Sequence, residues 1–397
     1  MKEAYLVDYG RSAFSRAHPR KPEVDDWAEI RGDALLAQVI DALLERSGLD
    51  PQAVEDLSVG CALPVKEQWS FGGRYPLWLS QRLGPHGRDC ASRQIDQQCG
   101  SGLAALRSAA REIQAGAVEV AVAGGCENMS RVPMGPTLFQ EGALTLPGAL
   151  QNAPWLELEV ALNMGLTAER LAQAAGIARD EMDEFALASH RRAAQADAEG
   201  RFDGERLALT NPAGKAVERD ANIRPDTSLE RLSGLAPVFL DEGRVTAGNS
   251  SPLTSGAAAT LLMSAGALER HDVSPIARIV AFADVGVTPE RMGAGAAAAA
   301  EQALARAGLT AAQIDVWEIN EAFAAVPLHA MRKLGLDPAR VNVWGGALAL
   351  GHPLGATGIR LAGTLARILA SRGGRYGCAT ACVGGGQGIA VVIESCL

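Results

Sequence analysis

Two largely apolar runs, each ending in a cluster of glycines, constrain the fold of this chain most. The first is Val118–Ala123, which runs into Gly124 and Gly125, and the second is Ala379–Val383, which runs into Gly384–Gly386. A run such as Val118–Ala123 is typical of a strand that is buried on both faces of a sheet. Both runs follow segments with helical spacing, so the chain is predicted to be an α/β protein.

The other predicted strands and helices fall into two similar blocks. Strands are predicted at Tyr5–Asp8, Leu57–Cys61, Ile276–Phe282 and Val316–Ile319. Helices are predicted at about 35–44, 103–113, 301–307 and 355–369, with Gly48 and Gly308 as stop signals for the first and the third. In each block a residue with reactive chemistry, Cys99 or His352, precedes a helix that leads to a strand and a glycine cluster. This order predicts two related halves whose reactive turns meet at one end.

The segment between the blocks, at about 128–252, has a different character. Prolines interrupt it repeatedly, and few runs in it have the alternation of a strand. Two helices are predicted there, at about 164–175 and 180–198. Such a loop-rich insertion is typical of a segment that carries a binding site on a rigid scaffold.

Length and charge narrow the class of protein. The chain has 397 residues and a net charge of −9, which argues against binding to nucleic acid. No run approaches the roughly 20 apolar residues of a membrane span. The chain opens on a predicted strand rather than on the apolar core of a signal peptide, so we expect a cytoplasmic protein. Its seven cysteines form no compact disulfide framework and are expected to be reduced.

Cys99 lies in the segment Gln97–Gly102, directly before a predicted helix. The free N–H groups at a helix N-terminus favour negative charge, so this position is expected to lower the pKa of the thiol and to make Cys99 a nucleophile. The small residues around it are expected to leave the sulfur accessible. The alternative is a buried structural cysteine.

Three further residues combine suitable chemistry with suitable positions. His352 lies in the turn Gly351–Pro353, where it is either an acid–base group or a surface histidine. Cys382 ends a strand before Gly384–Gly386, whose N–H groups fit an oxyanion site; the alternative is a buried strand cysteine. Asn320 either caps a helix or orients a water or an acyl oxygen. Cys378 and Cys382 have C-x3-C spacing, but no second Cys/His pair completes a zinc site, so no metal is expected.

Together these segments resemble the thiolase family over nearly the whole chain. The nucleophile segment, Asn320–Phe323, Gly345–Gly358 and Cys382–Gly386 occur in the order and at the spacing of that family, and further similar segments are Gly124–Ser130, Met164–Glu169 and Ala247–Ser251. The resemblance implies a five-layered α-β-α-β-α fold of two similar halves with a loop domain. The implied domains are an N-terminal half (1–127 with 253–273), a loop domain that covers CoA (128–252) and a C-terminal half (274–397).

The resemblance also implies a reaction and its residues. Thiolases reversibly convert a 3-oxoacyl-CoA and CoA into acetyl-CoA and a shortened acyl-CoA through an acyl-enzyme. Cys99 would be the acylated nucleophile, His352 would take its proton, and Cys382 would be the second acid–base group. His352 and a water held by Asn320 would form one oxyanion hole, and the N–H groups of Cys99 and Gly384 the other.

The same resemblance implies the ligands and the assembly. Ser251 would contact CoA, and Met164 and Met292 would line the acyl pocket, although both methionines could equally fill the core. CoA and acyl-CoA are substrates, and no permanently bound cofactor is expected. The protein is expected to be a homodimer or a homotetramer.

Departures from the family pattern bear on the substrate. Asn163 stands where many biosynthetic thiolases carry His, which favours a degradative 3-ketoacyl-CoA thiolase over a biosynthetic acetoacetyl-CoA thiolase. The aromatic segment Lys66–Trp78 is interpreted as an acyl-pocket wall, a dimer contact or ordinary core. A ketoacyl-synthase-like condensing enzyme is a lesser alternative, because such enzymes generally lack a base like Cys382. An inactive acyl-CoA-binding relative is another, because it would be expected to lose Cys99, His352 or Cys382, and all three are present.

Overall fold

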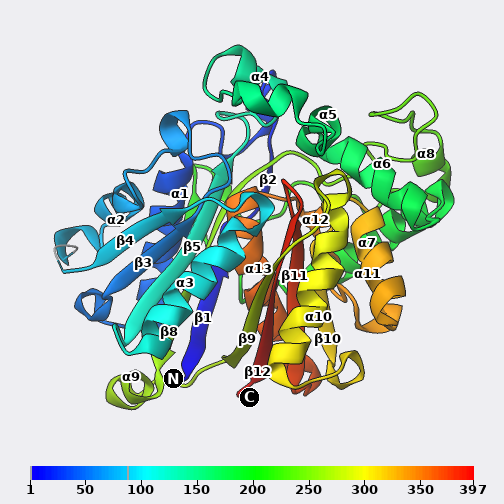
Figure 1. The fold of residues 1–397 in the computed structure, drawn as a ribbon. Coiled ribbons are helices and arrows are strands. Elements are labelled where there is room, and N and C mark those ends of the chain that lie inside the picture. The colour runs from blue at the N-terminus through cyan, green and yellow to red at the C-terminus, as the bar shows by residue number, and fades with distance from the viewer. Residues whose placement is uncertain (1, 87–88) are drawn as a thin grey trace.

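The computed structural model describes residues 2–86 and 89–397. Its main sheet has the strand order β10-β11-β12-β9-β1-β8-β5-β3-β4 (Figure 1). The first half of the sheet contains β1 (Ala4–Arg11), β3 (Asp56–Gly60), β4 (Ala91–Ile95), β5 (Val120–Asn128) and β8 (Thr254–Ser264), with the short β2 (Ser15–Arg16) paired to β8. The second half contains β9 (Ala277–Gly286), β10 (Val316–Ile319), β11 (Tyr376–Val383) and β12 (Gln387–Ser395).

The two halves of the sheet repeat one pattern of strand pairing. In the first half β3 and β5 are parallel, and β8 pairs antiparallel with both β5 and β1. In the second half β10 and β11 are parallel, and β12 pairs antiparallel with both β11 and β9. Only a short ladder between β1 and β9, in which Tyr5 pairs with Arg278 and Leu6 with Ala277, joins the halves. The weak repeat read from the sequence therefore has a structural counterpart.

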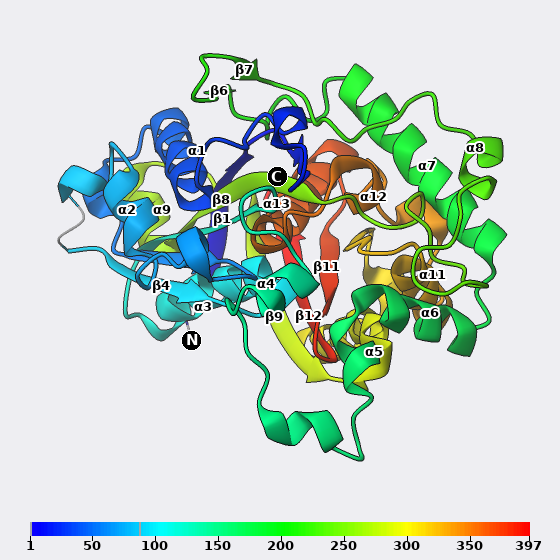
Figure 2. The same cartoon turned by 90° about the horizontal axis from the view of Figure 1, so that it is seen from above.

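The helices complete a layered arrangement. α3 (Ser101–Ala115) and α13 (Leu354–Arg372) pack against each other between the halves of the sheet, where α13 contacts β5 and β8 on one side and β11 and β10 on the other. α1 (Gly32–Ser47) covers β8 and β5, and α10 (Gly295–Ala307) covers β12 and β9 (Figures 1 and 2). The remaining helices are α2 (Arg74–Leu79), α4 (Pro136–Gln140), α5 (Leu158–Leu162), α6 (Met164–Ala174), α7 (Arg179–Ala198), α8 (Leu229–Ser233), α9 (Ala265–His271), α11 (Ala325–Leu334) and α12 (Ala347–Leu350).

The sequence of α13 explains its central place. Most of its residues are apolar or small, and nearly all of them are buried, so the helix has two apolar sides rather than one. It ends at Gly373, whose φ of 66° is the left-handed conformation that glycine adopts without strain. A helix buried in this way separates two sheet layers and holds both.

The predicted strand Val118–Ala123 was expected to end at Gly124, and this was wrong. β5 continues through both glycines to Asn128, and Gly125 pairs with Gly60 on one side and with Ala258 on the other. Glycine is present because the start of α13 lies directly against the strand: a Cβ on Gly125 would overlap the carbonyl of Gly355. The glycine marks a close approach of two backbones, not a strand end.

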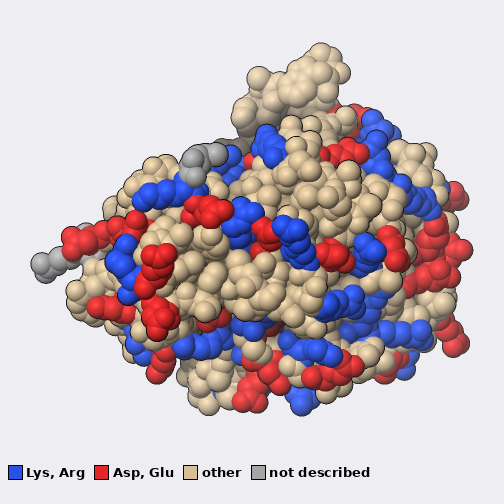
Figure 3. Space-filling view, turned by 90° about the horizontal axis from the view of Figure 1, so that it is seen from below, with Lys and Arg blue, Asp and Glu red and all other residues tan. Residues whose placement is uncertain are grey.

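The insertion is loop-rich, as predicted. It holds α4 to α8 and a small ladder of β6 (Leu209–Thr210) with β7 (Ala216–Val217), and the predicted helices at 164–175 and 180–198 correspond to α6 and α7. Residues 142–156 between α4 and α5 contain no charged residue, and Figure 2 shows this part projecting from the molecule. On the face in Figure 3, Lys and Arg side chains are interspersed with Asp and Glu, and the projecting part is uncharged.

The aromatic segment Lys66–Trp78 is not ordinary core. Trp69, Phe71 and Trp78 are each about half exposed, at 50%, 53% and 51%, and together with Tyr75 they form a cluster of ring contacts on the surface beside β4. Phe71 has a φ of 50°, which is an unfavourable conformation for an aromatic residue. The core interpretation of this segment is therefore wrong.

Candidate active site

Close packing of two helix N-termini brings Cys99 and His352 to one place. Cys99 lies in η5 (Gln98–Gly100), which leads into α3, and His352 lies in the turn that leads into α13. The helices approach through glycines, since a Cβ on Gly102 would lie 2.6 Å from the carbonyl oxygen of Gly355. Cys99 packs in one apolar cluster with Leu354 from the first turn of α13. The predicted meeting of the two reactive turns is thus observed.

The environment of Cys99 differs from the expectation in one respect. The residue is only 4% exposed, and burial raises the pKa of its thiol to about 11. Backbone N–H groups of Gly384 and of Cys99 itself act in the opposite direction, but they do not outweigh burial. The prediction of an accessible sulfur with a lowered pKa was wrong. Desolvation of the buried thiol raises its pKa more than the helix N-terminus lowers it. The cysteine therefore needs a base to take its proton.

His352 is held in the form of such a base. The hydroxyl of Thr357 lies 2.7 Å from Nδ1 and donates its own hydrogen to the carbonyl of Pro353. Nδ1 must therefore carry the hydrogen and donate it to Thr357, which leaves the lone pair on Nε2. Burial, assisted by the charge of Arg360, lowers the pKa of His352 to about 3, so the ring is neutral at pH 7. The histidine is buried, and the surface alternative is excluded.

Asn320 faces the free nitrogen of this histidine. Its Nδ2 lies 3.2 Å from Nε2 of His352 and donates to it. The backbone N–H of Asn320 donates to the carbonyl of Thr380, which places the residue at the end of β10 beside β11. α11 does not begin until Ala325, so Asn320 is not its cap. The side chain therefore serves the site rather than a helix end.

Cys382 approaches from the end of β11. It is fully buried, and burial together with the negative charge of an ionised Cys99 raises its pKa well above the usual range for a thiol. The glycine turn after it lies against η5, since Gly384 is close to Gln98 and a Cβ on Gly100 would lie 2.7 Å from Val383. Two sulfurs, one imidazole and one amide thus converge between the two halves of the sheet.

Two buried carboxylates stabilise these loops through hydrogen bonds. The sequence analysis did not single them out. Glu127 at the end of β5 accepts hydrogen bonds from the N–H groups of Ala62 and Gly355, at 3.0 and 2.9 Å. Glu321 accepts from the hydroxyl of Ser189 at 2.6 Å and from the N–H of Leu348 at 3.1 Å. Both residues lie in segments that carried the family resemblance, and that was the one available signal for them.

A cleft of about 340 Å³ lies beside the segment that precedes His352, since Leu348 is part of its lining. Its lining includes the basic side chains of Arg224 and Arg231, and Ser250 and Pro252 lie at its wall. Ser251, between the latter two, donates its N–H to the carbonyl of Ala322 and so connects the cleft to the segment of Asn320. The two arginines were not predicted, because single arginines in a loop carry no sequence signal.

The two predicted acyl-pocket methionines lie on the side of Cys382. The sulfur of Met164 is 3.4 Å from the place of a Cβ on Gly384. Met292, in η7 (Pro289–Ala294), is 1% exposed and belongs to the same apolar cluster as Cys382. Both positions are compatible with contact to an acyl group, and Met292 also fills the core.

Within 2–86 and 89–397, no group of three His, Cys, Asp or Glu side chains is arranged to hold a metal ion. In that same part of the chain, no helix is both long enough and apolar enough to cross a membrane.

Comparisons with known proteins assign this chain and its fold to one class of acyl-transferring enzymes. Residues 21–266 match the family model for the thiolase N-terminal domain, and residues 273–395 match the one for the thiolase C-terminal domain. The chain belongs to the thiolase family. The family, the fold and the acyltransferase class expected from the sequence are therefore confirmed.

Individual relatives cover the chain almost completely. A 3-ketoacyl-CoA thiolase of Marinobacter nauticus is 41% identical over 402 residues, which is 99% of this chain and 98% of the relative. An acetyl-CoA acetyltransferase of Shinella zoogloeoides is 39% identical over 375 residues, or 93% of this chain and 94% of the relative. The crystal structure of human mitochondrial 3-ketoacyl-CoA thiolase in complex with CoA is 33% identical and superimposes with a TM-score of 0.87, over 100% of this chain and 98% of that one.

Proposed function

We propose that this protein is a degradative 3-ketoacyl-CoA thiolase, which cleaves a 3-oxoacyl-CoA with CoA into acetyl-CoA and an acyl-CoA shortened by two carbons. The observation that carries the proposal is the convergence of Cys99 and Cys382 beside a neutral His352 that Asn320 orients. The relatives named 3-ketoacyl-CoA thiolase support the same activity.

In the first half-reaction the sulfur of Cys99 attacks C3 of the substrate. His352 Nε2, which carries a lone pair, takes the thiol proton as the carbon–sulfur bond forms. The protonated Nε2 and a water held by Asn320 then donate hydrogen bonds to the oxygen that becomes negative. Because the thiol and the imidazole are both neutral at rest, the proton moves with the attack and not before it.

Collapse of this intermediate breaks the bond between C2 and C3 and leaves the acyl group on Cys99. The electron pair goes to C2 as the enolate of acetyl-CoA, and Cys382 donates its proton there. Its raised pKa suits this role, because a thiol that stays protonated at pH 7 is available as an acid. The N–H groups of Cys99 and Gly384 would receive the oxygen of the thioester. The α-carbon is already activated by the thioester, so the chemistry requires no further cofactor.

In the second half-reaction the sulfur of CoA attacks the acyl carbon and gives its proton to the Cys382 thiolate, and the bond between the acyl carbon and Cys99 breaks as His352 returns its proton to the Cys99 sulfur. The cleft beside Ser251 is the proposed entrance for CoA, and its two arginines, Arg224 and Arg231, match the negative charge of the CoA phosphates. Among the residues that the structure describes, the guanidinium of Arg224 has no hydrogen-bond or ion-pair partner, whereas Arg231 pairs with Asp226. Met164 and Met292 would contact the acyl group beside Cys382.

A biosynthetic acetoacetyl-CoA thiolase is the second candidate, because the relative from Shinella zoogloeoides is named an acetyl-CoA acetyltransferase. Asn163 argues for the degradative enzyme. Its side chain accepts hydrogen bonds from the N–H groups of Gly165 and Leu166 and caps α6, so it is engaged as a cap where a histidine would be free to meet a substrate.

The assembly and the compartment belong to the same proposal. We place the enzyme in the cytoplasm as a homodimer or homotetramer, with the exposed aromatic cluster of Trp69, Phe71 and Trp78 as the dimer contact. The proposed domains remain an N-terminal half of 1–127 with 253–273, a loop domain of 128–252 over CoA, and a C-terminal half of 274–397.

A thiolysis assay tests the activity and the choice between the two candidates. The protein is mixed with CoA and with 3-ketoacyl-CoA substrates from four carbons upward, and the loss of enolate absorbance is followed. Turnover that extends to long or branched chains supports the degradative enzyme. Turnover confined to acetoacetyl-CoA supports the biosynthetic one, and no turnover with any substrate contradicts both.

A further inference from the structure

A fully buried ion pair joins β10, which leads into Asn320, to α13, which begins two residues after His352. Arg360 of α13 donates through Nη1 to Oε2 of Glu318 in β10 at a distance of 2.6 Å. Both side chains are 0% exposed. The proposed mechanism gives this pair no role, because neither residue contacts Cys99 or Cys382.

The pair is poorly suited to stabilise the fold. It has a single short contact rather than the two of a bidentate pair, and Arg360 Nε, Arg360 Nη2 and Glu318 Oε1 have no hydrogen-bond partner among the residues that the structure describes. Buried charges lose their hydration, and replacing such a pair by apolar side chains of similar volume is often neutral or stabilising. Its contribution must therefore come from what it positions.

Its position relative to the site is specific. Glu318 lies in β10, and Asn320 directly follows the last residue of that strand, with its N–H still bonded to Thr380 of β11. The spacing of two residues along this extended backbone places both side chains on the same side. Arg360 lies one turn after Thr357, whose hydroxyl accepts from Nδ1 of His352. Glu318 with Arg360 thus links β10 to α13, and Asn320 with His352 links the residue that follows β10 to the turn that precedes α13.

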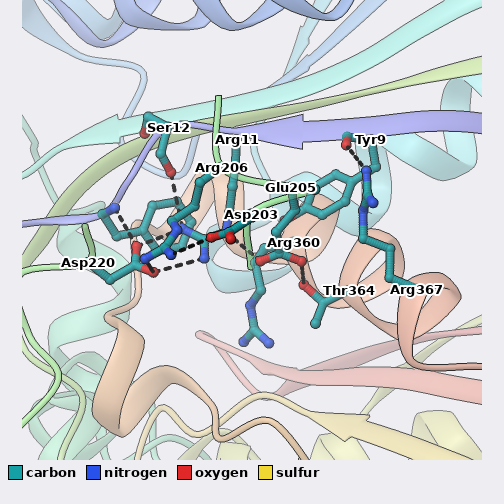
Figure 4. A network of polar contacts seen from close by, with 12 residues as sticks. Tyr9, Arg11, Ser12, Asp203, Glu205, Arg206, Asp220, Arg360, Thr364 and Arg367 are labelled. Atoms are coloured by element: carbon teal, nitrogen blue, oxygen red, sulfur yellow. Dashed lines mark hydrogen bonds and ion pairs between the residues drawn. The ribbon is translucent and has the colours of Figure 1, made fainter. Parts of the chain in front are cut away.

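A second buried glutamate, Glu205, also bonds to α13, but Arg360 pairs with Glu318 instead. Glu205 binds Arg11 and the hydroxyl of Thr364, which lies one turn further along α13. Figure 4 shows the guanidinium of Arg360 pointing away from Glu205, and it extends instead to β10. Glu205 and Glu318 are both buried and both bond to α13, but Glu318 lies on the strand that leads into Asn320.

We propose that Arg360 and Glu318 are positioning residues, which fix the spacing between β10 and α13 and thereby align Asn320 with His352 for the oxyanion of the substrate. This inference rests on the proposed thiolysis. The charge of Arg360 supports it, because that charge also favours the neutral form of His352 that the reaction needs.

The test compares Glu318→Gln with Glu205→Gln in the full-length enzyme. Each change replaces a buried glutamate that bonds to an arginine by an uncharged amide of the same size. We measure kcat and the KM for CoA in thiolysis, and the rate at which iodoacetamide alkylates Cys99. For Glu318→Gln we expect kcat to fall by about 10- to 100-fold, since a misplacement of about 1 Å in a catalytic group costs roughly that much. The KM for CoA should stay within about twofold, because this pair does not line the proposed CoA cleft. The alkylation rate should also stay within about twofold, because Thr357 still holds His352, the base of Cys99, in place.

The control and a second variant make each result decisive. Glu205→Gln should keep kcat within about twofold, because its hydrogen bonds go to Arg11 and Thr364 and not to β10. The double variant Glu318→Gln/Arg360→Met removes both charged groups and leaves no unpaired charge in the interior. It therefore tests the inference even if Glu318→Gln fails to fold. Its kcat should also fall. A folded variant of either kind with wild-type kcat overturns the inference. An inactive wild-type enzyme would instead overturn the proposed function.

Discussion

The substitution Gly125→Ala tests whether the contact between β5 and α13 sets the catalytic geometry. A Cβ at this position would overlap the carbonyl oxygen of Gly355 and lie 2.6 Å from its carbonyl carbon. Ordinary contacts begin at 3.4 Å, so the start of α13 must move by at least 0.8 Å. The atoms in the way are backbone, which has no rotamer to yield. Because His352 lies three residues before Gly355, the movement is transmitted to the imidazole.

The magnitude follows from this displacement. A shift of about 1 Å in a catalytic group lowers turnover on the order of 100-fold. Overpacking of this kind also destabilises a fold by about 1–3 kcal/mol. We therefore expect a large loss of kcat in the thiolysis assay, together with a measurable shift of the midpoint in urea unfolding.

The adjacent residue provides a matched control. A Cβ on Gly124 would point to the opposite face of β5 and meet the side chain of Leu36 at 2.8 Å, where a flexible end can move aside. Gly124→Ala should therefore keep kcat within about twofold and cost at most about 1–2 kcal/mol. The reasoning is refuted if Gly125→Ala has normal kcat, or if both variants lose turnover equally.

Three further predictions concern the chemistry. Cys99→Ala should abolish the acyl-enzyme in mass spectrometry, and retained turnover would remove Cys99 from its role. Cys382→Ser should slow thiolysis and condensation while acylation by acetyl-CoA remains measurable; a parallel loss of acylation would contradict the separate roles of the two cysteines. The neutral His352 has a pKa lowered from 6.5 to about 3, so the unfolded state binds the extra proton as pH falls through this window. The neutral His352 should therefore contribute up to roughly 5 kcal/mol to the free energy of unfolding, and this contribution should be lost between pH 6.5 and 3. In His352→Gln, urea unfolding should lack this part of the pH dependence.

Much of the fold could be predicted because local patterns agree with it. Val316–Ile319 was predicted with the bounds of β10, and the helix expected at 301–307 is the second half of α10, which ends at the predicted Gly308. β8 was not predicted as a strand. Its sequence, Thr254–Ser264, is rich in alanine and small residues, which favour a strand only when both faces are packed by other elements.

The candidate site also has features that local sequence patterns predict and features that only the folded chain shows. The glycine-flanked turns of Cys99 and His352 are local features, and the structure brings them together as expected. The pKa of Cys99 was predicted in the wrong direction, because desolvation depends on everything that packs around the sulfur and not on the helix start alone. Glu127 and Arg224 act from distant parts of the sequence, and only the folded chain brings them to the site.

The most direct test of the account is to trap the acyl group. The enzyme is mixed with a 3-ketoacyl-CoA in the absence of CoA, quenched in acid, digested and examined by mass spectrometry. The account predicts that the peptide containing Cys99 gains an acyl group two carbons shorter than the substrate, while one equivalent of acetyl-CoA is released. An adduct on another cysteine, or release of acetyl-CoA with no acyl group on Cys99, would contradict it.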